Sequence, residues 1–233
     1  MKNTSILSFL FVIALFASCK KKDTEPYVET PVTVASHPNG YLKNYLACSI
    51  VSKTLPLKKN YNSSAYFYSD SMVTDLVEID SVVLNKKTLK KRSNLTYYLN
   101  DSTIAAPESN WHVQGKNGVP VFDHTISLPS YTSYNLLPDS VDLHKDLIIQ
   151  VSDVLYSTKG TLTLTDNLGK SIVKEYKPGN ASVTFTAGEL AYLHKYGQLY
   201  FYINLFNQET KKFDGKRFWF ENQLFFDKYM IPY

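Results

Sequence analysis

Hydrophobic and polar residues alternate with a period of two along most of this chain. The pattern fits β-strands, because successive strand side chains point to opposite faces. It is clearest in QLYFYINLFN, residues 198–207, where Leu199, Phe201 and Ile203 share one face. Eighteen tyrosines and 13 phenylalanines against nine glycines add to this preference, since aromatic residues are enriched in sheets. The sequence therefore predicts an all-β protein.

The predicted strands form two groups. They are separated by LPSYTSYNLLPDS, residues 128–140, whose prolines and turn residues favour a domain boundary. We expect one β-sandwich domain over residues 37–136 and a second over residues 137–233, which ends with KRFWFEN and QLFFDKYMI as a last pair of strands. Short strands spaced by turns are typical of immunoglobulin-like sandwiches, although the Cys…Trp…Cys signature of true immunoglobulin domains is absent. The prediction is two immunoglobulin-like β-sandwich domains in tandem.

Two local motifs predict finer structure in the second group. GTLTLTD and KSIVKEY, residues 160–166 and 170–176, flank a short turn and predict a hairpin. Thr186 and Glu189 have the spacing of a capping box, in which each residue satisfies a backbone N–H of the other. This spacing predicts one or two helical turns after Thr186.

The N-terminus predicts export and a lipid anchor. Lys2 precedes an apolar run at residues 6–16 that is shorter than the roughly 20 residues needed to span a membrane. FASC, residues 16–19, resembles the lipobox of bacterial lipoproteins, in which the cysteine takes a diacylglyceryl thioether and becomes the acylated first residue. The resemblance implies a signal peptide at residues 1–18 and lipidation of Cys19. The alternative is an ordinary secretory peptide that happens to contain a cysteine.

Residues 19–36 predict a flexible tether that carries the folded part away from the membrane. They are charged, contain two prolines and show no sustained periodicity. Lysines beside a lipid anchor attract anionic headgroups, each by on the order of 1 kcal/mol. Lys20 follows the cysteine where an inner-membrane lipoprotein would have Asp, so the resemblance implies the outer membrane. Both leaflets stay open, and KKKD favours the periplasmic leaflet because the surface-export signal is usually acidic.

Charge and cysteine content limit the partners and the chemistry. The net charge of +4 is spread over mixed signs and gives no argument for nucleic-acid binding. With Cys19 acylated, Cys48 is the only thiol left, so no intrachain disulfide is expected. Its setting, YLACSIV, predicts a small buried hydrophobic residue rather than a nucleophile.

No recognised catalytic motif is present. The sequence contains no GxSxG, GxGxxG, GxxxxGK or CxxC, and its five histidines lack the spacing of metal ligands. We therefore expect a non-catalytic protein without metal or cofactor. One alternative stays open: His112 and His124 could lie on adjacent antiparallel strands with Asp123 nearby, and could form the site of an envelope hydrolase.

Exposed aromatic side chains are the best candidates for ligand contact. Tyr200 and Tyr202 alternate with the apolar face of their strand and are expected to point outward. Trp219 shares a strand face with Arg217 and Glu221, so we expect it to be at least partly exposed. Aromatic rings of this kind stack on sugars, but they are also normal packing residues of a sandwich. Carbohydrate contact and plain packing both stay open.

Four Asp-Ser dipeptides resemble the O-glycosylation motif of exported Bacteroidetes proteins, in which Asp precedes Ser or Thr and then an aliphatic residue or Thr. The candidate acceptors are Ser71, Ser81, Ser102 and Ser140. The alternative is turn chemistry, because both side chains bond readily to the local backbone.

The whole chain loosely resembles small Bacteroidetes lipoproteins with tandem β-sandwich domains and no assigned activity. The resemblance rests on FASCKKKD, on Trp111-His112-Val113, on Gly118 to Phe122 and on Lys216 to Phe220. It implies the cell-envelope address and the β-sandwich fold. For the function, which the resemblance does not decide, we expect a non-catalytic binding or scaffold module that contacts a protein or a glycan at the cell envelope. The resemblance implies no catalytic residues.

Overall fold

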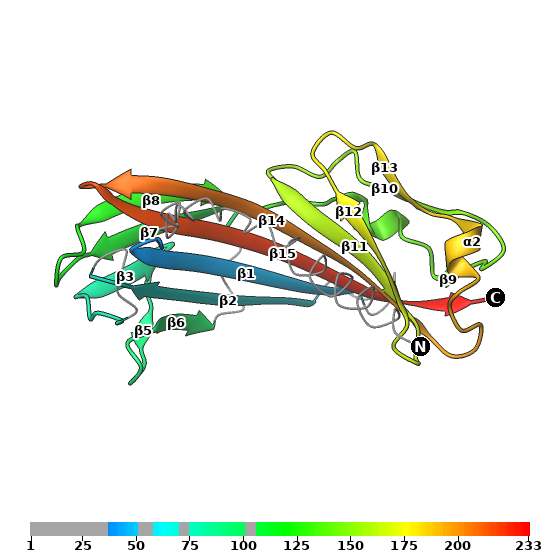
Figure 1. Ribbon diagram of the computed structural model, residues 1–233, viewed down its shortest axis with the longest axis horizontal. Coiled ribbons are helices and arrows are strands. Elements are labelled where there is room, and N and C mark those ends of the chain that lie inside the picture. Colours follow the sequence, from blue (N-terminus) through cyan, green and yellow to red (C-terminus); the bar gives the residue numbers. More distant parts are fainter. Residues whose placement is uncertain (1–36, 51–57, 70–74, 101–105) are drawn as a thin grey trace, which may run out of the picture. The chain divides into compact units, whose positions relative to one another are not determined.

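The computed structural model describes residues 37–50, 58–69, 75–100 and 106–233. Three of the predictions above, the signal peptide, the tether and the Cys19 lipidation site, lie outside these residues. The described residues form one compact unit. Most of its described residues are in strands and very few are helical, which confirms the all-β prediction (Figure 1).

The strands are β1 (Gly40–Ile50), β2 (Lys58–Phe67), β3 (Ser81–Leu84), β4 (Lys87–Thr88), β5 (Lys90–Lys91), β6 (Tyr97–Asn100), β7 (Glu108–Gln114), β8 (Phe122–Ser127), β9 (Ser140–Val141), β10 (Leu147–Gln150), β11 (Lys159–Thr165), β12 (Ser171–Tyr176), β13 (Ser182–Phe185), β14 (Leu199–Phe213) and β15 (Lys216–Pro232). The helical segments are a 3-10 turn at Ser133–Leu136 and the short helix α2 at Ala187–Leu190.

One large sheet runs in the order β12-β11-β14-β15-β1-β2-β6-β5, and β9 pairs with the end of β15. At its centre, β15 is antiparallel to β14 and parallel to β1. The β14–β15 hairpin closes through Asp214 and Gly215, whose φ angles of 48° and 73° are those of a tight turn that favours glycine. A four-stranded sheet, β4-β3-β7-β8, and the pair β10-β13 complete the structure.

Side chains of β15 alternate between two environments, with the buried Glu221 as the exception. Even-numbered residues from Phe218 to Met230 are buried, whereas most odd-numbered residues, Trp219 and Tyr229 among them, are partly exposed. Leu42 and Leu46 on β1 follow the same rule and face the same side as the even residues of β15. The large sheet therefore has an inner face that carries the cores and an opposite face, called here the outer face.

Two hydrophobic cores lie against the inner face. The first core lies between the small sheet, through Trp111 and Val82, and the inner residues Phe218 and Phe220 of β15. The second lies between the β10–β13 pair, through residues such as Phe185, and the inner residues of β11, β14 and β15. In Figure 1 the small sheet lies toward the turn of the β14–β15 hairpin, and the β10–β13 pair lies toward its open end.

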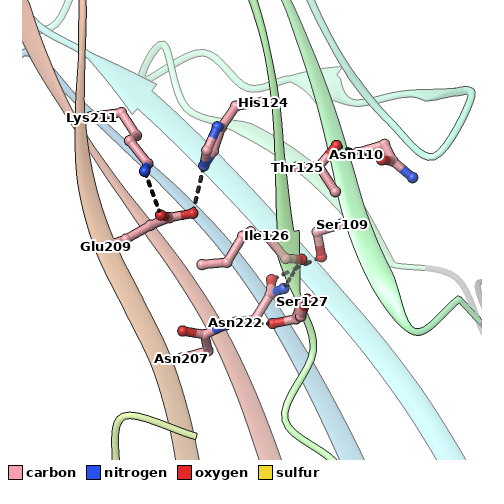
Figure 2. Close-up of polar contacts among 10 residues, drawn as sticks. All are labelled: Ser109, Asn110, His124, Thr125, Ile126, Ser127, Asn207, Glu209, Lys211 and Asn222. Atoms are coloured by element: carbon pink, nitrogen blue, oxygen red, sulfur yellow. Dashed lines mark hydrogen bonds and ion pairs between the residues drawn. The ribbon is translucent and has the colours of Figure 1, made fainter. Parts of the chain in front are cut away.

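A buried polar network separates the two cores along the inner face. Asn222 Nδ2 donates to the Ile126 carbonyl at 2.8 Å, and Asn222 Oδ1 accepts from the Ser109 hydroxyl at 2.8 Å (Figure 2). Asn44 Nδ2 donates to Ser109 Oγ and its Oδ1 accepts from Ser63 Oγ, both at 2.9 Å. Buried amides are stable when bonded in this way, and the network ties β1, β2, β7, β8 and β15 together.

The network explains why one strand prediction is wrong. The segments 216–222 and 223–231, expected as a pair of strands, form the single strand β15. Glu221, Asn222 and Gln223 interrupt the apolar pattern and look like a turn in the sequence. In the structure Asn222 stays inside the sheet, because Ser109 and Ile126, more than 90 residues earlier, satisfy its amide.

Two local predictions are confirmed. β11 and β12 pair as the expected hairpin, and Asp166 Oδ1 accepts the N–H groups of Leu168 and Lys170 in its turn, each at 2.9 Å. The capping box of Thr186 and Glu189 is present, and it starts α2. The hairpin and the capping box are each formed by residues close together in the sequence, so the sequence pattern alone was sufficient to predict them.

The predicted division into domains 37–136 and 137–233 stays a prediction. The first core is built mainly from residues before the boundary and the second mainly from residues after it. Strands from both sides nevertheless share the large sheet, since β1 pairs with β15 over its whole length. Phe218 and Phe220 also belong to the first core although they follow the boundary by more than 80 residues.

Candidate functional site

The outer face of the large sheet carries a run of aromatic side chains. They come from the positions that alternate with the core residues of β1, β2, β14 and β15, so the same period of two that builds the cores also builds this surface. Its rings gather in two clusters and one further pair, and a polar hollow lies on the same face.

The first group, called the Trp219 cluster, consists of Tyr41, Tyr66, Tyr68 and Trp219. Tyr41 stacks on Tyr66 with ring centres 4.9 Å apart, and the Trp219 ring lies 6.5 Å from that of Tyr41. Tyr68 meets Tyr66 edge-on at 6.0 Å. All four side chains are partly buried and partly exposed.

Tyr66 stays protonated in this setting. Burial, with smaller contributions from Tyr68, Tyr41 and Glu221, raises the pKa of Tyr66 to about 12. Its hydroxyl therefore remains a neutral group that can both donate and accept hydrogen bonds.

The second group, called the Tyr202 cluster, consists of Tyr45, Tyr202 and Phe225. The Phe225 ring lies 5.8 Å from Tyr202 and 6.3 Å from Tyr45, so the three rings cross three strands. Further along the same face, Tyr200 and Tyr229 pack against each other with ring centres 4.6 Å apart. They are the most exposed of these rings, at 42% and 48%.

A hollow of about 370 Å³ lies on the outer face beside Tyr45. The side chains of this face that line it are Lys43, Tyr45, Asn62, Ser64, Tyr98 and Gln223. Arg92 and Glu221 also line the hollow. The Arg92 guanidinium lies 4.1 Å from the centre of the Tyr98 ring. The hollow therefore combines aromatic walls with amide, hydroxyl and charged groups.

Polar contacts hold the floor of this hollow in place. Glu221 is buried to 8% exposure, pairs with Lys43 at 3.5 Å and accepts from the Gln208 amide. Gln223 Nε2 donates to Asn204 Oδ1 at 2.7 Å. These bonds fix the side chains in defined orientations, as a preformed binding surface requires.

The structure brings together only some of the residues chosen from the sequence. Trp219 is half-buried on the face opposite Phe218 and Phe220, as its alternation predicts. Tyr200 is exposed and Tyr202 half-buried on the same outer face. Tyr200 pairs with Tyr229, ten positions along β15 from Trp219, so about 33 Å of strand separates the two candidates.

The sequence analysis did not identify four tyrosines of this surface as candidates for ligand contact: Tyr41, Tyr45, Tyr66 and Tyr68. Their alternation was visible: in GYLKNYLACS the tyrosines occupy odd-numbered positions, which alternate with Leu42, Asn44 and Leu46. What the sequence does not contain is the pairing of Tyr41 with both Tyr66 and Trp219, which depends on the parallel contact between β1 and β15.

His112 and His124 do not form a common site. In the register of β7 and β8, His112 lies opposite Asp123 and His124 opposite the buried Trp111, so the two imidazoles point to opposite faces of the small sheet. His112 Nδ1 lies 2.8 Å from Asp123 Oδ1 on one face.

On the other face, His124 Nε2 lies 2.6 Å from Glu209 Oε1, whose second oxygen is 3.2 Å from Lys211 Nζ (Figure 2). The His124 ring also packs on Phe220, with ring centres 4.2 Å apart. These contacts join the small sheet to β14 and β15. They give His124 a structural role that explains its position without a catalytic function.

Cys48 is 1% exposed, which confirms its prediction as a buried residue. It lines an apolar hollow of about 650 Å³ on the inner side, together with Leu46, Tyr61 and Phe226. Burial raises the pKa of the Cys48 thiol to about 11, so the thiol stays protonated and is a poor nucleophile.

The proposed glycosylation sites differ in accessibility. Ser140 is exposed at the start of β9, and Ser81 is half-buried at the start of β3. Ser71 and Ser102 lie outside the described residues.

Within the residues that the structure describes, no group of three histidine, cysteine or acidic side chains could hold a metal ion. The same residues contain no helix with the length and apolar character needed to cross a membrane. Comparison with known proteins finds no family model that matches this sequence, and no curated protein with significant similarity to it.

Proposed function

We propose that this protein is a non-catalytic binding module of the cell envelope, and that it holds a glycan on the outer face of its large sheet. The observation that carries the proposal is the run of half-exposed rings, the Trp219 and Tyr202 clusters, next to a hollow lined with amides and hydroxyls. Aromatic faces pack against the apolar faces of sugar rings, and amides bond the sugar hydroxyls.

Plain packing explains this surface less well. Single exposed aromatic residues are normal, but contiguous apolar patches rimmed by polar groups are typical of binding sites. Here the rings contact one another across neighbouring strands while remaining partly accessible. A protein partner could use the same face, and a failure to bind any saccharide would favour that class of partner.

The hydrolase alternative has less support. A hydrolase site needs an acid and a base that converge on one substrate, within hydrogen-bond reach of the reacting atoms. His112 and His124 instead face opposite sides of the small sheet, and each is paired with its own carboxylate.

The test is retention by immobilised polysaccharides in affinity electrophoresis. Tyr45→Ala and Trp219→Ala should each reduce retention several-fold while leaving the thermal midpoint nearly unchanged, because both rings are partly exposed. Tyr196→Ala is the matched control, since Tyr196 is 65% exposed but lies in the loop before β14, and its ring contacts are with His194 and Lys195 rather than with either cluster. Equal retention of all three variants would rule out the outer face as the binding surface.

We also propose that Cys19 is lipidated and anchors the protein to the outer membrane through the tether at residues 19–36. The support is the lipobox-like FASC and the lysines that follow it. Cys19→Ser should release the protein from the membrane fraction. If the variant still sediments with membranes, the assignment of Cys19 as the lipid anchor is wrong.

For the fold, we propose that each core belongs to an immunoglobulin-like sandwich. The first would use β1, β2 and β15 against β3, β7 and β8, and the second β11, β14 and β15 against β10 and β13. In this arrangement the two sandwiches share the strands of one sheet.

A further inference from the structure

We propose that the hollow beside Tyr45 takes a sugar residue that carries a carboxylate, so that the ligand of this face is a uronic-acid-containing saccharide. The inference rests on the proposed glycan-binding function and adds the chemical class of the ligand. It comes from the charges of the hollow and from the geometry of Arg92.

The hollow has an excess of positive charge. Among the described residues that line it, Lys43 and Arg92 are basic and Glu221 is the only acid. Glu221 is already paired with Lys43 at 3.5 Å and bonded by the Gln208 amide. The charge of Lys43 is therefore largely compensated, and the charge of Arg92 is the one available to a ligand.

Arg92 is also held in a suitable orientation. Its backbone is fixed in a turn, since its N–H donates to the Thr96 carbonyl at 2.8 Å and its carbonyl accepts from the Leu95 N–H at 3.1 Å. Its guanidinium lies over the Tyr98 ring at 4.1 Å. A guanidinium stacked on an aromatic ring keeps its N–H groups at its edge, where they can bond both oxygens of a planar carboxylate.

The remaining groups suit the rest of a sugar. Tyr45 offers a ring face, and the side chains of Asn62, Ser64 and Gln223 offer donors and acceptors for hydroxyls. Tyr41 lies four residues before Tyr45 on the same strand face, about 13 Å away. A chain of several sugar residues could therefore contact both the hollow and the Trp219 cluster.

The test compares oligogalacturonate with its methyl ester by isothermal titration calorimetry, because esterification replaces each charged carboxylate by a neutral methyl ester and leaves the sugar rings and their hydroxyls unchanged. Wild-type protein should bind the free acid about tenfold more tightly than the ester, as expected for one charge-assisted hydrogen-bonded pair. Arg92→Gln should remove this preference. Lys86→Gln, which removes the same charge from an exposed turn outside the hollow, should retain it.

The outcomes separate the two proposals. Equal binding of both probes, still lost in Tyr45→Ala, would overturn the carboxylate inference and keep the glycan-binding face. Tighter binding of a sulfated oligosaccharide of equal charge would also overturn the carboxylate inference. Binding of none of these saccharides would overturn both proposals. A preference for the acid that persists in Arg92→Gln would overturn the inference that the carboxylate binds at Arg92 in this hollow.

Discussion

Asn222 is fully buried between the two cores, and both ends of its amide are bonded. Asn222→Ala would leave the Ser109 hydroxyl and the Ile126 carbonyl without this partner in a site that excludes water. We expect the free energy of unfolding to fall by about 2–4 kcal/mol, since each buried unsatisfied group costs about 1–3 kcal/mol. Urea denaturation followed by circular dichroism measures the change.

Asn110→Ala is the control for this prediction. Asn110 is exposed at the edge of the same region, where its side-chain amide donates to Asn85 Oδ1 and accepts from the Thr125 hydroxyl. Water can replace those bonds, so the cost should stay below about 1 kcal/mol. If Asn222→Ala costs no more than Asn110→Ala, the polar network does not hold the cores together.

At the scale of single elements, α2 depends on a carboxylate. Glu189 accepts from the Thr186 N–H at 2.9 Å and pairs with Lys174. The hydrogen bond from Lys174, followed by the bond from the Thr186 backbone, lowers the pKa of Glu189 to about 2. A pKa that is lower in the folded state means that the carboxylate stabilises the fold above its ordinary pKa of 4.5, and that this stabilisation is lost as the pH falls toward about 2.

Glu189→Gln should therefore be less stable than the wild type near neutral pH. The difference between their thermal midpoints should shrink as the pH falls from 4.5 toward about 2, because the wild-type residue then becomes protonated. Differential scanning calorimetry over this range checks it. A difference that stays constant with pH would mean that the charge of Glu189 does not stabilise α2.

Prediction from the sequence was most successful for elements built by sequence neighbours. The alternation of β14, the β11–β12 hairpin and the capping box all depend on spacings within a few residues. The continuity of β15 was not predictable, because the partners of Asn222 come from β7 and β8. The aromatic surface was predictable only in part. The alternation within one strand places Trp219 and Tyr200 on the face opposite the core, but the rings that they contact belong to neighbouring strands and depend on the strand order.

For the whole molecule, the β14–β15 hairpin extends past both cores, and β15 contributes Phe218 to one core and Met230 to the other. Loss of either core would expose apolar residues of the shared strands. We expect the described part of the chain to unfold in one calorimetric transition, with equal calorimetric and van't Hoff enthalpies. Two separate transitions would instead support independent domains divided at residue 136.

The outer face can be monitored directly, because the chain has only two tryptophans. Trp111 is 1% exposed in the first core, and its indole N–H has no hydrogen-bond partner among the described residues, so Trp111→Phe removes no hydrogen bond to them and keeps an aromatic ring in the core. In this variant Trp219 is the only tryptophan reporter.

The decisive measurement is the fluorescence of Trp111→Phe during titration with a saccharide that the protein retains. We predict a saturable change in Trp219 emission whose midpoint agrees with the calorimetric dissociation constant. Saccharide binding that leaves Trp219 emission unchanged would contradict the assignment of the outer face as the binding surface, and so would the absence of any saccharide binding.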